Sequence, residues 1–357
     1  MDNKINVLIT GAGAPGIDGT IFALKHNPQN IKFYIVTSDL NPKAVGKHLC
    51  DKFYTLPPPE SKNYLTEIIK IIKNEKLHII LPQTTREINI LSKYKKEISK
   101  ENCAIAISDH EKIKIANDKY LLLESCKKNH IPYPKYFLIN NKNQFNKALE
   151  NLNFGTNKVV IKPRNSNGQR GVRIITDEVT TFSKLISEKP SNLTMSYKEA
   201  IKVFSEQEHF DDYLVTEYLP NEEYTIDTFR SAKTIISIPR KRTRIRSGIS
   251  FETQIETNQK LIDYSNKLAL LLDLKYCFGF QFKYDDEGTP KILECNPRVQ
   301  GTMIASVLAG FNLIFYSIAE ALNIPYTLES NINMQSEFIR TWSGIGINNN
   351  NEPTKIS

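Results

Sequence analysis

The chain has 357 residues, 40% of them hydrophobic and 24% charged, which is ordinary for a globular protein and excludes wholesale disorder. Its 47 lysines and arginines against 39 acidic residues give a net charge of +8, which favours an anionic partner. Nucleic acid, a membrane surface and a nucleotide phosphate are all anionic, so the charge does not choose among them. At roughly 150 residues per domain, the length predicts two or three domains.

Composition along the chain predicts a cytoplasmic protein. The first ten residues, MDNKINVLIT, lack the apolar stretch and small-residue cleavage site of a signal peptide. The apolar segment Ala305–Ile324 contains Asn312 and Glu320, so we expect a buried helix and no membrane span. Five scattered cysteines without a C-x-x-C pair predict reduced thiols in the core.

The first hundred residues alternate between short apolar runs and helical spacing. The runs are Ile5–Thr10, Lys32–Thr37, Leu77–Leu81 and Cys103–Ser108, and Tyr64–Lys73 has apolar residues at helical spacing. Short strands separated by helices predict a doubly wound parallel α/β layer, which we assign to a domain over residues 1–110.

After residue 110 the pattern becomes α+β with antiparallel hairpins. Helices are predicted at Ala116–Lys128 and Asn258–Leu272, and strands at Val159–Lys162, Val172–Ile175, Tyr213–Glu217, Glu223–Arg230 and Thr234–Arg246. We therefore expect a second domain over residues 111–330, followed by a terminal strand and a flexible tail over 331–357.

A glycine-rich turn follows the first strand. Residues 11–16 have the form G-x-G-x-x-G, and Asp39 ends the next strand. Such glycines let the backbone approach a pyrophosphate at a helix amino terminus, as in dinucleotide-binding proteins. A tight strand-to-helix turn that binds no dinucleotide would have the same residues.

A lysine and a polar, glycine-containing loop follow the strand at Val159. Lys162 supplies a point charge, and Gly168 and Gly171 allow close backbone approach to a triphosphate. The loop is not a Walker loop, because no G-K-[ST] sequence opens a helix. The alternative is a solvated basic hairpin.

The most informative segment is a polar hairpin over Phe278–Arg298. A two-residue turn at Glu287-Gly288 would place Gln281 opposite Glu294, with Asn296 on the same face. Such hard oxygen ligands suit Mg²⁺ shared with substrate phosphates, and Arg298 could reach a phosphoryl group. The alternative is a half-exposed hairpin without a ligand.

Arginines alternate along the strand that ends near residue 246. Arg240, Arg242, Arg244 and Arg246 would share one face of an extended strand and would suit phosphate or carboxylate groups. No aromatic residues alternate with them, which argues against a nucleic-acid groove. For Arg240 and Arg242 the alternative is a solvated edge strand.

Two further segments carry candidate ligands. Val215–Asp227 could offer backbone groups to an adenine edge and a carboxylate to ribose hydroxyls, or could be a plain surface turn. Gln83, Arg86 and Glu87 follow a strand of the parallel layer, where such sheets present ligand contacts, and are candidates for substrate recognition. A helix cap is the alternative for these three residues.

In order along the chain, these segments resemble the ATP-grasp superfamily, with the closest likeness to single-lobe relatives of the carbamoyl-phosphate synthase large chain and to carboxylate–amine ligases. The resemblance runs from Ile5 to about Pro325. It implies an amino-terminal α/β domain followed by an ATP-grasp domain, whose lid covers about 117–216 and whose larger part covers about 217–330. In this family ATP is held between the lid and the larger part.

The resemblance also implies roles for individual residues. Lys119 and Lys162 would contact ATP phosphates, Glu217, Tyr218 and Leu219 would form the adenine-facing hinge, and Glu223 would bind ribose. Gln281, Glu294 and Asn296 would bind one or two Mg²⁺ ions (or Mn²⁺). Arg298 would stabilise the transferred phosphoryl group. Arg246, with Arg244 nearby, would engage the acyl phosphate or acceptor. Asn167 and Gln169 depart from the small residues common in the family's loop, and a single lobe does not match the full synthase.

The resulting hypothesis is an ADP-forming ligase that activates a carboxylate as an acyl phosphate and joins it to an amine. Its partners would be small molecules, with no nucleic acid or membrane, and homodimers are common among similar proteins. The alternative function is a nucleotide-binding sensor or scaffold without turnover. A third possible function is that of an NAD-dependent oxidoreductase.

Overall fold

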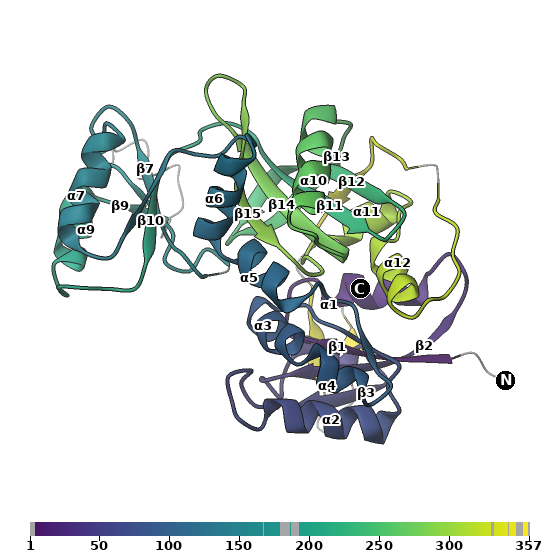
Figure 1. The fold of residues 1–357 in the computed structure, drawn as a ribbon. Helices are drawn as coiled ribbons and strands as arrows, with labels where there is room; N and C mark the ends of the chain where they lie inside the picture. The colour runs from purple at the N-terminus through teal and green to yellow at the C-terminus, as the bar shows by residue number, and fades with distance from the viewer. Residues whose placement is uncertain are drawn as a thin grey trace. The chain divides into compact units, whose positions relative to one another are not determined.

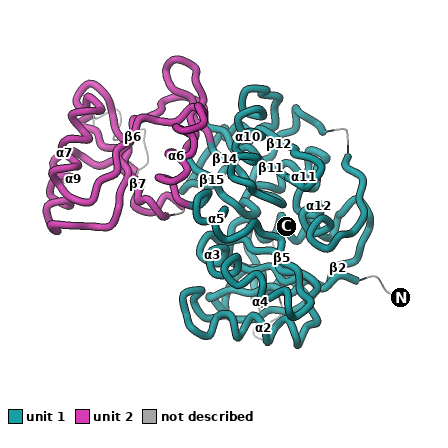
Figure 2. Tube along the Cα trace, viewed as in Figure 1, with its two compact units in different colours: residues 1–117, 223–281, 294–357 teal, residues 118–222, 282–293 magenta. Residues whose placement is uncertain are grey.

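The computed structural model describes residues 4–166, 168–178, 186, 193–329, 332–341, 343–347 and 353–355. The chain forms two compact units, each described here by itself (Figure 2). Unit 1 comprises residues 1–117, 223–281 and 294–357, and unit 2 comprises residues 118–222 and 282–293. The domain boundaries expected from the sequence remain predictions.

Unit 1 begins with a five-stranded parallel sheet in the order β3-β2-β1-β4-β5. Its strands are β1 (Lys4–Thr10), β2 (Lys32–Asp39), β3 (Lys52–Thr55), β4 (Ile79–Leu81) and β5 (Ala104–Ile105), and its helices are α1 (Ile17–Lys25), η1 (Val45–His48), α2 (Tyr64–Glu75), α3 (Thr85–Lys93), α4 (Lys95–Ser99) and α5 (His110–Asn117). The doubly wound parallel sheet predicted from the sequence is confirmed. Strand β3 was not predicted, because its sequence KFYT is a partly exposed edge strand without an apolar run.

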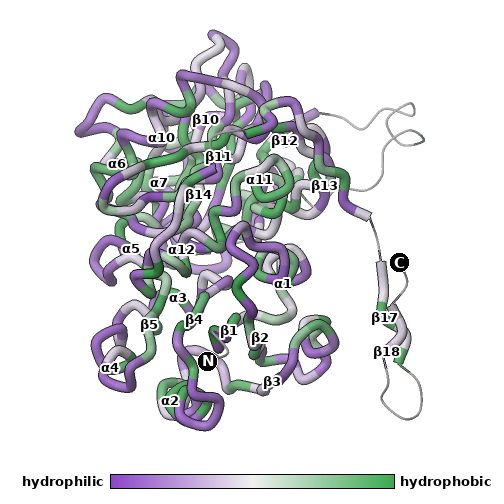
Figure 3. Tube along the Cα trace, turned by 90° about the vertical axis from the view of Figure 1, so that its right-hand side faces the viewer, coloured by the Kyte–Doolittle hydropathy of each residue, from purple (hydrophilic) through white to green (hydrophobic). Residues whose placement is uncertain are grey.

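Both faces of this sheet are buried, which explains its continuous apolar strands. Val7 and Ile9 point into one hydrophobic core and Leu8 into another, because successive side chains of a strand alternate between faces. The first core includes residues of α1, and the second includes residues of α2 and α3. Helix α2 carries hydrophobic and hydrophilic residues on different sides (Figure 3), and its buried residues are Tyr64, Ile68, Ile71 and Ile72.

A second sheet has the strand order β15-β14-β11-β12-β13-β16 (Figure 1). Its strands are β11 (Glu223–Arg230), β12 (Ile235–Arg246), β13 (Ile249–Ile255), β14 (Tyr276–Tyr284), β15 (Pro290–Asn296) and β16 (Glu337–Ile339), with helices α10 (Gln259–Leu271), α11 (Ile304–Leu308) and α12 (Leu313–Ala321). Strands β17 (Ile345–Ile347) and β18 (Pro353–Lys355) pair with each other.

The prediction of one buried helix over Ala305–Ile324 was wrong. Gly310 has a φ of +102°, a conformation that interrupts the helix between α11 and α12. Asn312 then caps α12 by accepting the N–H of Phe315 at 3.0 Å, and its Nδ2 donates to the carbonyl of Ala23 at 2.7 Å. The polar residue in this apolar segment therefore has a structural role.

Unit 2 contains a five-stranded sheet in the order β6-β10-β7-β8-β9. Its strands are β6 (Tyr136–Ile139), β7 (Val159–Pro163), β8 (Arg173–Ile175), β9 (Thr194–Met195) and β10 (Tyr213–Glu217), and its helices are α6 (Lys119–Lys128), α7 (Lys142–Asn151) and α9 (Tyr197–Phe204). Phe145 of α7 and Phe204 of α9 pack into one core with strand residues such as Ile161.

The helix predicted at Ala116–Lys128 is two helices. Helix α5 ends at Asn117, and Asp118 is the N-cap of α6, with its carboxylate accepting the N–H groups of Tyr120 and Leu121. This cap starts a new helix at Lys119, one of the predicted phosphate ligands. Within the described part of the chain, no helix is long and apolar enough to cross a membrane.

Candidate active site

The hairpin between β14 and β15 has a three-residue loop. Asp285 donates its N–H to the carbonyl of Thr289 at 3.1 Å, and Gly288 at φ +72° donates to the carbonyl of Asp285 at 3.2 Å. This is the loop in which a tight turn is followed by a left-handed residue. The predicted two-residue turn was therefore wrong, and Asp285 faces Thr289 instead of Pro290 at the start of the ladder.

Glu294, Asn296 and Arg298 form a connected series at the end of β15. The Asn296 amide donates to Glu294 Oε1 at 3.0 Å, and its Oδ1 accepts from Arg298 Nη2 at 3.1 Å. Arg298 also donates from Nε to Thr85 Oγ1 at 3.2 Å. Burial lowers the pKa of Arg298 while the charge of Glu294 opposes that shift. Unit 1 thus brings two predicted metal ligands and the predicted phosphoryl ligand together.

Glu223 and Gln281 lie at a second cation, Arg242. Arg242 Nη1 forms a short ion pair with Glu223 Oε1 and lies 3.5 Å from Gln281 Oε1. The carboxylate and amide oxygens predicted to bind ribose and metal therefore face a guanidinium. The sequence pattern predicts Arg242 on a phosphate-binding face and gives no sign of its contact with these residues.

The oxygen donors fit a Mg²⁺ ion by their chemistry. Glu294 supplies a carboxylate and Asn296 and Gln281 supply amides, and hard oxygens of this kind bind Mg²⁺. The Asn296 and Gln281 side-chain oxygens lie within hydrogen-bond distance of guanidinium groups, so positive charge is already stabilised at these positions. Among the residues that the structure describes, no group of three or more His, Cys, Asp or Glu side chains could hold a metal. A metal here would depend on the two amides.

The four alternating arginines do not share one face. Arg240 is only 1% exposed and binds Asp227 through Nε and Nη2, both at 3.1 Å, so the solvated-edge alternative for Arg240 was wrong. A register irregularity then separates Arg242 from the exposed Arg244, which pairs with Glu252 at 2.6 Å. The guanidinium of Arg246 lies 5.0 Å from the centre of the Phe251 ring.

In unit 2 the two predicted phosphate lysines are buried, near one loop. Lys119 and Lys162 are 7% and 6% exposed, and Lys119 Nζ donates to the carbonyl of Ser166 at 2.7 Å. Arg164, two residues after Lys162, binds Asp118 and Asp212 at 2.8 Å each and holds the start of the loop to α6.

The loop itself uses left-handed backbone. Gly168, Gln169 and Gly171 have φ values of +62°, +60° and +72°. A Cβ at Gly171 would lie 2.6 Å from Pro163 Cγ, so glycine is required there on two counts, whereas Gly168 faces open space. Asn167, the other departure from the family pattern, lies outside the described residues.

The predicted adenine hinge follows β10. Glu217 Oε1 accepts the N–H of Lys135 at 2.9 Å and Lys291 Nζ at 2.6 Å. Burial lowers the pKa of Lys291, but its bonds to Glu217 and Asp285 outweigh burial and the pKa is raised. Leu219 is buried, and the Tyr218 ring lies 5.2 Å from Lys283 Nζ. Glu217 therefore ties the hinge to the β14–β15 hairpin tip.

At the carboxyl edge of the parallel sheet the candidate substrate residues Arg86 and Glu87 contact different partners. The Glu87 carboxylate is buried and accepts hydroxyl groups of Thr10, Thr84 and Tyr64, and burial raises its pKa despite these bonds. Arg86 is instead exposed and bound to Glu60, with Nε 2.9 Å from Oε1. The structure therefore does not bring Arg86 and Glu87 together.

The glycine-rich turn packs closely against other parts of unit 1. Gly13 donates its N–H to Asp39 Oδ2 at 2.7 Å, so this carboxylate caps the turn. A Cβ at Gly16 would lie 2.7 Å from Gly301 Cα, and one at Gly19 would lie 2.8 Å from Ile304 Cβ. Close packing therefore explains why glycine occupies positions 16 and 19.

Three buried N–H groups in this part of unit 1 lack a hydrogen-bond partner within the described residues, and two of them, on Gln300 and Arg340, were not predicted from the sequence. Arg340 donates to the carbonyls of Pro15 and Gly301 at 2.8 Å each, while its Nε has no hydrogen-bond partner within the described residues. Arg240 Nη1 and Gln300 Nε2 are likewise buried and unpaired there, and Gln300 packs against Gly279. No local motif identifies Arg340, because it comes to the turn from β16.

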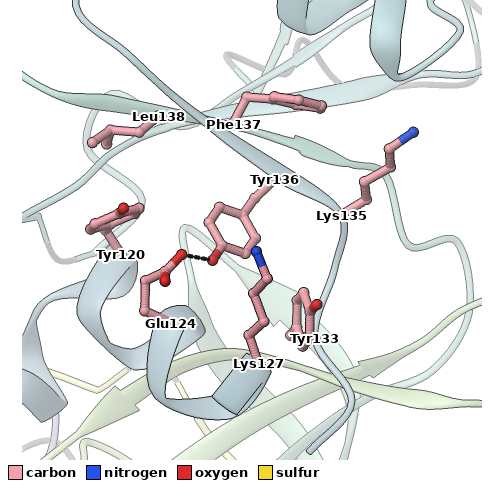
Figure 4. Close-up of a pocket in the computed structure, with 8 residues that line it drawn as sticks. All are labelled: Tyr120, Glu124, Lys127, Tyr133, Lys135, Tyr136, Phe137 and Leu138. Carbon is pink, nitrogen blue, oxygen red and sulfur yellow. Dashed lines mark hydrogen bonds between the residues drawn. The ribbon is translucent and has the colours of Figure 1, made fainter. Parts of the chain in front are cut away.

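A pocket of about 340 Å³ lies in unit 2 (Figure 4). Figure 4 shows the Tyr136 hydroxyl turned toward Glu124, to which it donates a short hydrogen bond, and burial raises the pKa of Tyr136. The lining residues are Tyr120, Glu124, Lys127, Tyr133, Lys135, Tyr136, Phe137 and Leu138. None of these eight is a predicted nucleotide, metal or substrate ligand.

The resemblance to the ATP-grasp superfamily rests on three features: a parallel α/β layer, an antiparallel sheet bearing Glu294, Asn296 and Arg298, and a smaller unit with a lysine loop. Residues 209–344 match the family described as ATP-grasp in the biosynthetic pathway with Ter operon, and residues 7–107 match the PylC-like N-terminal domain. The later part of the chain is therefore similar to an ATP-grasp domain and the earlier part to a PylC-like N-terminal domain, in agreement with the resemblance seen in the sequence.

Two curated relatives are carbamoyl phosphate synthase large chains. The chain is 24% identical to that of Clostridium acetobutylicum over 290 residues, which are 77% of this chain and 24% of the relative. It is 24% identical to that of Methanothrix thermoacetophila over 365 residues, 94% of this chain and 31% of the relative. The chain therefore spans less than a third of the length of these relatives.

Solved structures share the fold at low identity. N5-carboxyaminoimidazole synthetase from Staphylococcus aureus complexed with ADP has a TM-score of 0.67 at 15% identity, covering 92% of this chain and 80% of that one. A biotin carboxylase–β,γ-ATP complex from Campylobacter jejuni has a TM-score of 0.67 at 16% identity, covering 92% of this chain and 73% of that one. At these identities the likeness shows the fold alone.

Proposed function

We propose that the chain is an ATP- and Mg²⁺-dependent ligase that activates a small-molecule carboxylate as an acyl phosphate and joins it to an amine. The series Glu294–Asn296–Arg298 carries the proposal, because it places oxygen donors for a divalent ion beside a half-buried guanidinium. This combination suits neutralisation of charge on a transferred phosphoryl group. The curated relatives, which are synthases, support the same class of reaction.

In the first step a carboxylate oxygen of the substrate attacks the γ-phosphorus, the bond to the bridging oxygen breaks, and ADP leaves. We assign phosphate contacts to Lys119 and Lys162, adenine contacts to the hinge at Glu217, Tyr218 and Leu219, and ribose contacts to Glu223. Glu294, Asn296 and Gln281 would hold Mg²⁺, which when bound supplies positive charge to the phosphates. Arg298 stabilises the developing charge.

In the second step the amine nitrogen attacks the acyl carbon, the carbon–oxygen bond to phosphate breaks, and the amine loses a proton as the amide forms. The unpaired donors on Arg240, Gln300 and Arg340 support an anionic substrate near the glycine turn. A buried donor without an acceptor costs about 1–3 kcal/mol, which a carboxylate oxygen would offset. Arg246 and Arg244 are further candidates for acceptor contacts, and the cytoplasm is the proposed location.

The test is ADP release from the full chain over a panel of carboxylates and amines, with Mg²⁺ present. We expect ADP release that depends on one carboxylate and one amine, and Glu294→Gln should lower kcat at least a hundredfold, as expected for a residue essential to electrostatic stabilisation.

Glu287→Gln is the matched control, because Glu287 is an exposed residue at the hairpin turn and has no assigned role. Equal turnover in Glu294→Gln and wild-type chain would refute the metal assignment. ATP binding by calorimetry without turnover across the whole panel would refute the ligase.

A further inference from the structure

Arg242 connects acceptors from several strands of the antiparallel sheet. Its side chain is 4% exposed, and it comes from β12, whose neighbours in the sheet are β11 and β13. Nε donates to Ser250 Oγ at 2.8 Å, and Nη2 donates to the carbonyl of Gly248 at 2.6 Å. These bonds from two nitrogens fix the plane of the guanidinium.

The third nitrogen, Nη1, faces the residues assigned to the nucleotide. It forms the short ion pair with Glu223 Oε1 from β11 and lies 3.5 Å from Gln281 Oε1 on β14. A guanidinium whose plane is already fixed is a preorganised donor, so less conformational entropy is lost for each bond that it makes. Arg242 therefore determines where the Glu223 carboxylate lies.

Only one oxygen of Glu223 is used in this contact. Oε1 accepts from Arg242, and Oε2 makes no hydrogen bond within the described residues. The Glu223 side chain is 17% exposed, so its second oxygen can still be reached. A carboxylate held by one oxygen can accept neighbouring hydroxyl groups of a sugar with the other.

We infer that Arg242 is a positioning residue that orients Glu223 toward the ribose hydroxyls and thereby sets discrimination between ATP and deoxy-ATP. The inference rests on the proposed function, because it takes Glu223 as the ribose ligand. Arg242 itself touches no substrate in this account. Its effect should therefore concern the sugar and be small for the phosphates.

The same geometry predicts that lysine cannot replace Arg242 fully. A lysine ammonium carries the charge but lacks the planar fork, so it cannot hold Glu223, Ser250 and Gly248 at once. Arg242→Lys should keep the attraction to Glu223 and lose part of its orientation. Arg242→Gln should lose both.

The experiment measures binding of ATP, 2′-deoxy-ATP and 3′-deoxy-ATP to the full chain by calorimetry. We expect wild-type chain to prefer ATP, Arg242→Gln to lose roughly tenfold in that preference, and Arg242→Lys to fall between them, as expected for the loss of one charge-assisted hydrogen bond. Glu223→Gln should lower the preference by a similar factor.

Arg230→Gln is the matched control. Arg230 ends β11, the strand that begins with Glu223, and it pairs with Asp273 at 2.8 Å. This variant should keep the wild-type preference for ATP. Circular dichroism and melting of each variant check that it is folded.

A wild-type chain that binds ATP and deoxy-ATP equally would overturn the inference and leave the ligase proposal standing. Equal weakening of all three nucleotides in Arg242→Gln would overturn it too, because a purely structural role weakens them alike. A chain that binds no nucleotide at all would refute both the proposed function and this inference.

Discussion

The burial of its ion pair determines how much each arginine of β12 contributes to the stability of the chain. Arg240 and Asp227 are 1% and 0% exposed, and Asp227 also accepts the Ser306 hydroxyl at 2.7 Å. Removing one partner of such a pair leaves an uncompensated charge in the interior, whereas an exposed pair contributes little. Two arginines four residues apart on one strand therefore differ sharply in their effect on stability.

We expect Arg240→Met to destabilise the chain by about 3–5 kcal/mol, because the buried Asp227 loses its counter-ion. Arg244→Met should cost only about 0–1 kcal/mol, because the Arg244 side chain is 49% exposed in its pair with Glu252. Urea denaturation followed by circular dichroism measures both. Similar midpoints for the two variants would contradict this account of the pair.

Among elements, the glycine turn after β1 shows how closely two segments pack. Gly16 and Gly301 face each other. A Cβ at Gly16 would lie 2.7 Å from the Gly301 backbone. A Cβ at Gly301 would meet nothing closer than Pro15 Cβ at 3.8 Å. Neither glycine has a positive φ. The restriction at Gly16 is therefore steric.

Gly16→Ala should destabilise the chain by roughly 1–3 kcal/mol, the usual cost of overpacking, because the new methyl group meets backbone that must move. Gly301→Ala should change the melting temperature little, because its methyl group makes ordinary van der Waals contact. Thermal unfolding of the two variants is the measurement. A larger loss in Gly301→Ala would show that the two segments do not pack in this way.

Across the whole molecule, the cysteines behave as core residues. All five are free thiols; four are buried, and Cys50 is half-buried. Burial raises the pKa of the Cys103, Cys126 and Cys277 thiols to about 12 each. Reduced core thiols were expected from the scattered spacing, and the structure places four of the five in the core.

A thiol reagent at pH 8 should therefore modify Cys50 in the native chain well before the other four, because only Cys50 is accessible and the thiolate is the reactive form. Native titration with a disulfide reagent should show one faster equivalent, and denatured chain should show all five at once. Cys50→Ser should abolish the faster phase. Equal rates for all five thiols in the native chain would contradict the burial.

Much of the fold could be predicted because its signals are local. Continuous apolar runs predicted the parallel sheet, and the strands at Tyr213–Glu217 and Glu223–Arg230 have the predicted bounds. The errors were local too: Asp118 caps a new helix, Gly310 interrupts another, and Gly288 lengthens a hairpin loop. A capping carboxylate or a left-handed glycine can override the hydrophobic period in a few residues.

The sequence by itself determined the fold class and indicated the residue types of the candidate site, because strand and helix periodicities and the spacing of Glu294, Asn296 and Arg298 are properties of short segments. Only the tertiary structure decided the partners of those residues: that Arg242 holds Glu223, that Arg240 is buried on Asp227, and that Arg340 reaches the glycine turn. These contacts join residues up to 325 positions apart. Pairing at such separations depends on how whole elements pack, which no local pattern records.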